Sequence, residues 1–217
     1  MLFSESKKFV FIAVPRTGTT SIELEMRRLD PTILRNEMVY PDGEIRTVNK
    51  HITLRDVQDI LGSKAEEYAY YAFVREPIDH TISRYYYYAT GRGRQRLKDR
   101  AVSSHRIRAL RLRVWFARLM PRPLWFVFYP VKLQSSFVSD ADGQYALDFC
   151  GSLEHIDRDL SAMLLHAGYR DVDARVEHVN SAPRDAIGRV ERRFIVSVLK
   201  RRLKPDLDLF KTLLRHG

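Results

Sequence analysis

The sequence predicts an α/β fold in which a central parallel sheet is flanked by helices as a three-layer sandwich, with a mainly helical second half. Two apolar segments, 9–14 and 69–74, are each followed by a polar turn and then by residues with helical periodicity. Strands that alternate with helices in this way form parallel sheets that are covered on both faces. In the second half, apolar residues recur at helical spacing over 156–167 and over 190–198, before Pro205.

Local signals set the boundaries of the first helices. The helix after the first strand ends before Pro31, because proline does not continue a helix. Thr53 and Asp56 have the spacing of a capping box, and Gly62 ends the helix that they begin. The second strand leads into a helix over 77–89, whose first residue is a proline.

A helix over 103–120, between the two halves, does not have one clean apolar face. One side would carry Ile107, Leu110, Val114 and Ala117, and the other would carry Leu112, Trp115, Phe116 and Leu119. Arginines lie between the two sides, and an aromatic run follows at 124–129. Two interpretations stay open: a helical flap that folds on the core with solvated arginines, or a peripheral contact of segment 91–130 with an anionic membrane or polyanionic acceptor.

The chain of 217 residues is long enough for one buried core, and no linker or repeat divides it. We therefore predict a single domain over 1–217, with a basic and aromatic insertion at about 91–130. The formal net charge is +10, and much of it lies in this insertion, which therefore attracts anions. No nucleic-acid reading motif accompanies the charge, so we expect no specific nucleic acid partner.

Cys150 is the only cysteine of the sequence, which excludes a disulfide framework and a cysteine-based zinc site. A reducing cytoplasm fits this composition. The first apolar strand begins within ten residues, which leaves no room for a cleavable signal sequence. No apolar run approaches the roughly 20 residues that cross a bilayer. We therefore expect a cytoplasmic protein, with peripheral membrane contact through the insertion as the alternative.

The turn between the first strand and its helix has the features of an anion cradle. It reads Arg16-Thr17-Gly18-Thr19-Thr20-Ser21. Gly18 lets the backbone turn tightly, and the first helical amides, which lack intrahelical acceptors, point at a ligand. The positive end of the helix dipole and Arg16 favour phosphate or sulfate. The turn lacks the second glycine and the lysine of a Walker A motif. An ordinary strand-turn-helix corner is the plain alternative.

This turn resembles the 5′-phosphosulfate-binding element of the sulfotransferases, which usually reads Pro-Lys-Thr-Gly-Thr-Thr-Ser. Six of the seven positions match, and Arg16 stands in place of the lysine. A second stretch has Arg75, Pro77, Ser83 and Tyr85 at the spacing of the other cofactor element of that family. His80 stands where many relatives carry a second arginine.

Weaker matches extend the likeness over residues 8–211, towards the bacterial and membrane-associated carbohydrate sulfotransferases of the "sulfotransferase family 2" type. They are the segment His51-Ile52-Thr53, the stretch from Ala146 to Glu154, which corresponds to a strand that leads into a glutamate-bearing helix, and the pair Asp206 and Phe210. The resemblance implies a P-loop-like fold.

The resemblance also implies a reaction. A sulfuryl group would pass from the donor 3′-phosphoadenosine 5′-phosphosulfate (PAPS) to a hydroxyl of an acceptor, most plausibly a carbohydrate or glycolipid, and no metal would be needed. The phosphosulfate would lie on residues 16–21 and the 3′-phosphate on Arg75 and Ser83. Arg16 would stabilise the charge that develops on the bridging oxygen of the leaving phosphate.

His51 is the candidate general base, because imidazoles titrate near neutral pH and the family has a histidine at this point. Glu154 is the first alternative. The remaining histidines have no spacing suited to a metal site.

Two other functions stay open. A P-loop-like nucleotide kinase or phosphotransferase would share the strand-turn-helix element, but this turn lacks the Walker lysine. A non-catalytic nucleotide- or polyanion-binding protein of the same fold is consistent with the two departures from the family pattern, Arg16 and His80.

Overall fold

The computed structural model describes residues 1–89, 104–128, 131–170, 174, 176 and 187–216, without the side chains of 104–111 and 213–216. Contacts divide the chain into two compact units. Unit 1 comprises Met1–Glu76, Lys132–Ser181 and Pro205–Gly217, and unit 2 comprises Pro77–Val131 and Ala182–Lys204. The single domain over 1–217 stays a prediction. Of the expected insertion at 91–130, residues 91–103 and 129–130 lie outside the described residues.

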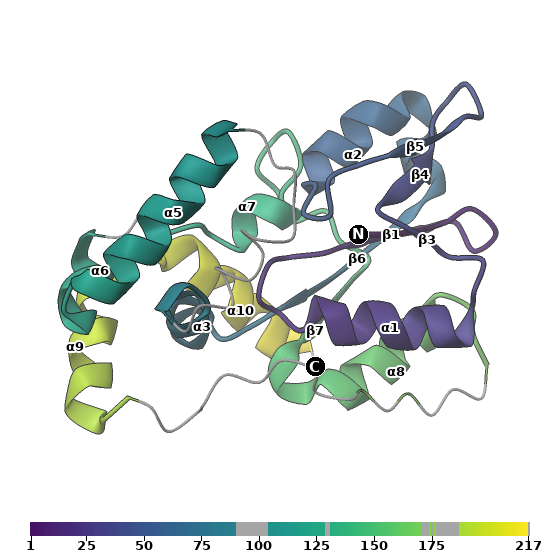
Figure 1. Cartoon of the computed structure of the whole chain (residues 1–217). Coiled ribbons are helices and arrows are strands. Elements are labelled where there is room, and N and C mark those ends of the chain that lie inside the picture. The colour runs from purple at the N-terminus through teal and green to yellow at the C-terminus, as the bar shows by residue number, and fades with distance from the viewer. Residues whose placement is uncertain (90–103, 129–130, 171–173, 175, 177–186, 217) are drawn as a thin grey trace. The chain divides into compact units, whose positions relative to one another are not determined.

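In the described part of the chain, unit 1 is built on a five-stranded sheet with the order β3-β1-β2-β6-β7 (Figure 1). Three strands run parallel: β2 (Phe9–Ile12), β6 (Ala69–Val74) and β7 (Phe149–Ser152). The short strand β1 (Leu2–Ser4) pairs antiparallel with β2 and with β3 (Leu34–Arg35). The fold is therefore α/β as predicted, but the sheet is mixed rather than parallel throughout.

Very short strands account for this correction. β1 and β3 have three and two residues, which is too few to show the alternation that identifies a strand in a sequence. The same holds for β4 (Glu37–Val39) and β5 (Ile45–Thr47), which form a separate antiparallel pair.

Helices cover both faces of the sheet in unit 1. Phe9, Phe11, Tyr71 and Phe73 point to one face, where they pack on α1 (Thr19–Leu29) and α8 (Ile156–His166). The alternate residues Val10, Ile12, Tyr70 and Ala72 pack on α2 (Leu54–Leu61), α7 (Ser135–Val138) and α10 (Lys204–His216). In Figure 1, α1 and α8 lie below the strands and α2 lies above them. Unit 1 therefore has three layers, and the strands are apolar on both sides because both sides are buried.

The local signals of the first half are confirmed. α1 ends at Leu29, before Pro31. The capping box at the start of α2 is complete, since Thr53 Oγ1 accepts from the Asp56 amide at 3.1 Å and the Asp56 carboxylate accepts from the Thr53 amide at 3.4 Å. β6 has the predicted bounds, and α3 (Pro77–Ala89) follows it as expected.

The second half is helical apart from β7 among the described residues. After β7 the chain makes a 3-10 turn, η2 (Leu153–His155), and enters α8, so Glu154 lies in the turn before the expected helix. α9 (Arg189–Leu199) matches the expected helix. Pro205 lies in the first turn of α10, so it begins the next helix, a position where its missing amide costs little.

Unit 2 contains α3, α5 (Ser104–Leu119), α6 (Arg122–Phe128) and α9. Trp125 is buried, and its ring lies 5.2 Å from that of Tyr85 and 5.0 Å from that of Phe126. Arg122 joins α6 to α9 through an ion pair with Glu191. No helix in the described part of the chain is both long enough and apolar enough to cross a membrane.

The capping box gives a stability prediction. Thr53→Ala removes the side chain that accepts from the Asp56 amide, so we expect the free energy of unfolding to fall by about 1 kcal/mol. Urea unfolding followed by circular dichroism measures this change. Ser63→Ala, at an exposed position just after α2, is the control and should have little effect. Equal losses in both variants would contradict the role of the capping box.

Candidate functional site

The carboxyl ends of β2, β6 and β7 lie at one edge of the sheet, because the three strands are parallel and in register. Ile12 pairs with Ala72, and Ala72 pairs with Cys150. From this edge the chain enters the turn that contains Arg16 and Gly18, the segment that begins at Arg75, and η2. Ligands of open α/β sheets bind outside such carboxyl ends.

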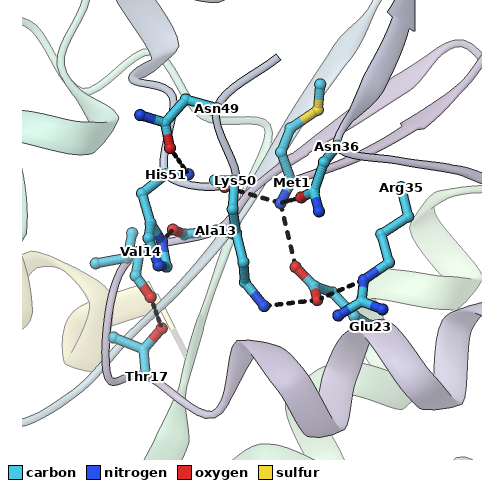
Figure 2. Close-up of polar contacts among 10 residues, drawn as sticks. All are labelled: Met1, Ala13, Val14, Thr17, Glu23, Arg35, Asn36, Asn49, Lys50 and His51. Atoms are coloured by element: carbon cyan, nitrogen blue, oxygen red, sulfur yellow. Dashed lines mark hydrogen bonds and ion pairs between the residues drawn. The ribbon is translucent and has the colours of Figure 1, made fainter. Parts of the chain in front are cut away.

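The turn after β2 is held in shape by its own groups. Gly18 is the N-cap of α1 and has a φ of 76°, and Arg16 also has a positive φ, of 70°. The buried Thr17 hydroxyl donates to the carbonyl of Val14 at 3.0 Å (Figure 2). The Thr17 side chain therefore stabilises the turn. Because its hydroxyl proton is already donated, Thr17 would contact an anionic ligand through its backbone.

Gly18 is also required by packing. A Cβ atom at this position would lie 2.6 Å from Leu153 Cδ1 and 3.3 Å from Ile156 Cδ1. The turn after β2 therefore rests directly on the segment that follows β7. Both a left-handed backbone and the absence of a side chain favour glycine here.

The N-terminus of α1 has the properties of an anion site. The first helical hydrogen bonds run from the Ser21 and Ile22 amides to the Gly18 carbonyl, at 3.0 and 3.2 Å. The amides of Thr19 and Thr20 precede these bonds and lie at the positive end of the helix. No acidic residue occupies the first turn of α1. Together with Arg16, this end of the helix suits a phosphate or sulfate group.

His51 lies at the same edge of the sheet, although it is 38 residues from Ala13 in the sequence. Its Nδ1 atom is 2.6 Å from the carbonyl oxygen of Ala13, the residue that follows β2 (Figure 2). A carbonyl oxygen only accepts, so Nδ1 carries the proton and the lone pair of the neutral ring is on Nε2. The Asn49 side chain accepts from the His51 amide at 3.0 Å and fixes the backbone here. The structure thus brings His51 beside the turn that carries Arg16.

A buried carboxylate ties the His51 segment to α1. Glu23, in the second turn of α1, accepts from Lys50 Nζ at 2.8 Å and from the Met1 amino group at 3.1 Å, and Arg35 Nε lies 3.3 Å away (Figure 2). The Met1 amino group also donates to the Lys50 carbonyl at 2.9 Å. Glu23 therefore gathers Lys50, Arg35 and the Met1 amino group around one carboxylate that is 1% exposed.

Charge and burial compete in this cluster. Burial raises the pKa of Glu23, but the Met1 amino group and Lys50 lower it more, so the net shift is downwards. Burial lowers the pKa of the Met1 amino group to about 6, against the opposing effect of Glu23. Glu23 could not be identified from the sequence, because a glutamate in a helix carries no signal of contacts with residues 1, 35 and 50.

Arg75 begins the segment after β6, and a glutamine holds its backbone in place. The Arg75 amide donates to Gln134 Oε1, and Gln134 Nε2 donates to the Arg75 carbonyl, both at 2.8 Å. Asp206 in turn accepts from the amides of Gln134 and Ser135, at 2.8 and 2.9 Å. Burial raises the pKa of Asp206, and these hydrogen bonds oppose the rise. The Asp206 match noted in the sequence thus has a structural role, and Gln134 was missed.

The predicted site residue Ser83 lies in unit 2, on α3, as does His80, which departs from the family pattern. Ser83 and His80 are both buried there. The assignment of Ser83 to a 3′-phosphate together with Arg75 stays a prediction. Glu154 belongs to unit 1, where it accepts from the Glu76 amide at 3.0 Å and from the Ser152 hydroxyl at 2.6 Å. It therefore links the segments that follow β6 and β7.

Comparison with known proteins adds no family assignment: no family model matches the chain, and neither a curated protein nor a solved structure shows a significant match. The likeness to sulfotransferases therefore stays a resemblance that rests on the motifs themselves.

Gly18→Ala tests whether the turn after β2 needs glycine. We expect the positive φ alone to cost about 1–2 kcal/mol in the free energy of unfolding. Gly143→Ala is a matched control, because Gly143 has a φ of 77° and open space around its Cβ position. Only Gly18→Ala should also weaken the binding of adenosine 3′,5′-bisphosphate, since the new methyl group displaces the turn. Equal affinities of the two variants in titration calorimetry would contradict this role.

Glu23→Gln should be among the more damaging substitutions in unit 1. It removes the carboxylate that accepts from Lys50 and from the Met1 amino group and that pairs with Arg35, so we expect a loss of about 3 kcal/mol in urea unfolding at neutral pH. The lowered pKa of Glu23 sets the acid side of the pH dependence: the contribution of the ionised carboxylate is full above the ordinary value of 4.5 and disappears as the pH falls through the lowered one.

Asp59→Asn is the control for Glu23→Gln, because it breaks the exposed pair of Asp59 with Arg55 in α2. Exposed pairs of this kind contribute little to stability. A small loss in Glu23→Gln, similar to that of the control, would show that the buried cluster does not hold the fold together.

Proposed function

We propose that the chain transfers a sulfuryl group from PAPS to a hydroxyl of a carbohydrate or glycolipid acceptor, and that unit 1 carries the P-loop-like part of the fold. One observation supports this most. The two stretches that resemble sulfotransferase cofactor elements follow the adjacent parallel strands β2 and β6. Arg16 and Arg75 therefore belong to segments that leave the sheet at the same edge. His51 reaches the same edge from a third segment.

In this proposal the turn 16–21 binds the 5′-phosphosulfate. The amides of Thr19 and Thr20 donate to its oxygens, and the positive end of α1 favours its charge. Arg75 binds the 3′-phosphate, because a guanidinium offers a planar fork of donors that matches a phosphate group. The hydrogen bonds between Gln134 and the Arg75 backbone support this role, since they fix the position of the backbone that carries the Arg75 side chain.

The donor supplies the sulfuryl group, which the acceptor hydroxyl attacks in line while the bond from sulfur to the bridging phosphate oxygen breaks. Arg16 and the turn amides stabilise the negative charge that develops on this leaving oxygen. Because that charge grows only as the bond breaks, Arg16 acts more on turnover than on donor affinity. Where the family has a lysine with a compact ammonium group, this chain has Arg16 with a planar guanidinium. One of the several N–H groups of Arg16 therefore donates to the leaving oxygen.

His51 takes the proton of the attacking hydroxyl in this proposal. Its Nδ1 proton is engaged by the Ala13 carbonyl, so the basic atom of the neutral ring is Nε2. A histidine whose orientation is fixed by a hydrogen bond to its other nitrogen is well prepared as a base. Glu154 is the weaker candidate, because its carboxylate already accepts from the Glu76 amide and the Ser152 hydroxyl.

Two measurements test the function directly. Titration calorimetry should show that adenosine 3′,5′-bisphosphate binds more tightly than ATP or adenosine 5′-monophosphate. Labelled PAPS should then transfer its sulfate to glycans or glycolipids in an acceptor screen. Tighter binding of ATP would favour the nucleotide kinase or phosphotransferase instead. Bisphosphate binding without transfer to any acceptor would favour the non-catalytic binding protein.

His51→Ala should reduce turnover by roughly 10²–10⁴-fold, the usual contribution of a general base, and leave bisphosphate affinity nearly unchanged. His155→Ala removes an exposed histidine from η2 and is the control. Nitrogen NMR of the wild-type imidazole should also show the proton of neutral His51 on Nδ1. Near-native turnover of His51→Ala would overturn the assignment and make Glu154 the next base to test.

A further inference from the structure

Helix α5 presents an apolar face to solvent within unit 2. Its side chains are described from Leu112 onwards. Leu112, Trp115 and Leu119 are 63%, 56% and 64% exposed. Their spacing of three and four residues places them along one side of the helix. Val114 and Ala117, on the opposite side, are buried, so α5 packs on unit 2 with one side and leaves the other apolar side exposed.

Arginines border this apolar side. At 100° per residue, the half-buried Phe116 and Met120 extend the apolar side beyond Leu112. Arg118 then lies at one border, next to Trp115, and Arg113 lies at the other, next to Met120. Both arginines are exposed. This is the side that the sequence analysis expected to carry Leu112, Trp115 and Leu119, with arginines between the two sides.

The neighbouring helix α6 also has exposed apolar side chains. Leu124 and Phe128, one helical turn apart, are exposed, whereas Trp125 and Phe126 are buried. The sequence from Arg100 to Ser139 contains seven arginines and one lysine and no acidic residue. One of these arginines, Arg122, is paired with Glu191 of α9. The surface formed by Leu112, Arg113, Trp115, Arg118 and Leu119 is called the α5 face below.

We propose that the α5 face binds the surface of an anionic lipid bilayer, with α5 lying parallel to it. A helix binds in this way when an apolar side enters the boundary between headgroups and acyl chains and basic side chains meet anionic headgroups. The long arginine side chains reach the headgroups while their stems cover apolar surface. A tryptophan at the border of such a side suits the interface, because one part of its ring is apolar and the other polar.

The charge of the α5 face and its exposed apolar side chains favour an anionic bilayer over a second copy of the chain or a nucleic acid. A second copy of the chain would bring the same arginines together, and the net charge of +10 opposes that contact. A nucleic acid would meet the arginines but leave the apolar side chains in water. Of these three occupants, the anionic bilayer is the one that matches both features. The proposal does not depend on the sulfotransferase function, because it rests on a surface of unit 2.

The test uses the full chain and vesicles of defined composition. Co-sedimentation should show binding to vesicles of phosphatidylcholine and phosphatidylglycerol in equal parts, and little binding to phosphatidylcholine alone. Added salt should weaken the binding. Tryptophan fluorescence, to which Trp115 and the buried Trp125 both contribute, should shift to the blue with the anionic vesicles, and this shift should be absent in Trp115→Ser. Arg113→Gln and Arg118→Gln should each weaken binding about five-fold at low salt. Trp115→Ser should weaken it about ten-fold.

Matched controls come from exposed helix positions in unit 1. Leu165→Ser replaces a leucine of α8 that is 58% exposed, and Arg55→Gln removes one positive charge from α2. Neither should change vesicle binding. All these positions are exposed, so circular dichroism should show intact folding. Equal losses in the control variants, or no binding to anionic vesicles, would overturn the proposal. Self-association without lipid that Trp115→Ser abolishes would also overturn it, in favour of a contact between copies.

Discussion

The parallel pairing of β2, β6 and β7 is the constraint on which the candidate site depends. Because these strands run in one direction and in register, three segments that are distant in the sequence leave the sheet at one edge. The turn after β2 then packs on the segment after β7, where Gly18 leaves no space for a side chain beside Leu153. The short strands β1 and β3 widen the sheet, and their register places the start of β1 and the end of β3 beside the carboxyl end of β2.

Buried polar groups hold the candidate residues in place at this edge. Glu23 binds Lys50, the neighbour of His51, and Gln134 binds both backbone groups of Arg75. Each of these groups gives up water on burial, and the cost is offset only when its hydrogen bonds are made. Because these hydrogen bonds need specific partners, they favour one particular arrangement of the segments at this edge.

Local features of the fold could be predicted from the sequence, and distant contacts could not. The capping box of Thr53 and Asp56, the helix over 77–89 and the glycine turn are encoded within a few residues, and all three are present. Glu23 and Gln134 contact residues that are 27 and 59 positions away, and neither has a pattern that identifies its partner. His51 was named because of the resemblance, and its place beside Ala13 became visible only in the fold.

Backbone amide NMR during titration with adenosine 3′,5′-bisphosphate and adenosine 5′-monophosphate tests the central claim most directly. If the edge binds the donor as proposed, both ligands shift the amides of Thr19 and Thr20, because both carry a 5′-phosphate. Only the bisphosphate then shifts Arg75, which is proposed to bind the 3′-phosphate. Shifts confined to other parts of the chain, or the same response of Arg75 to both ligands, would contradict the account.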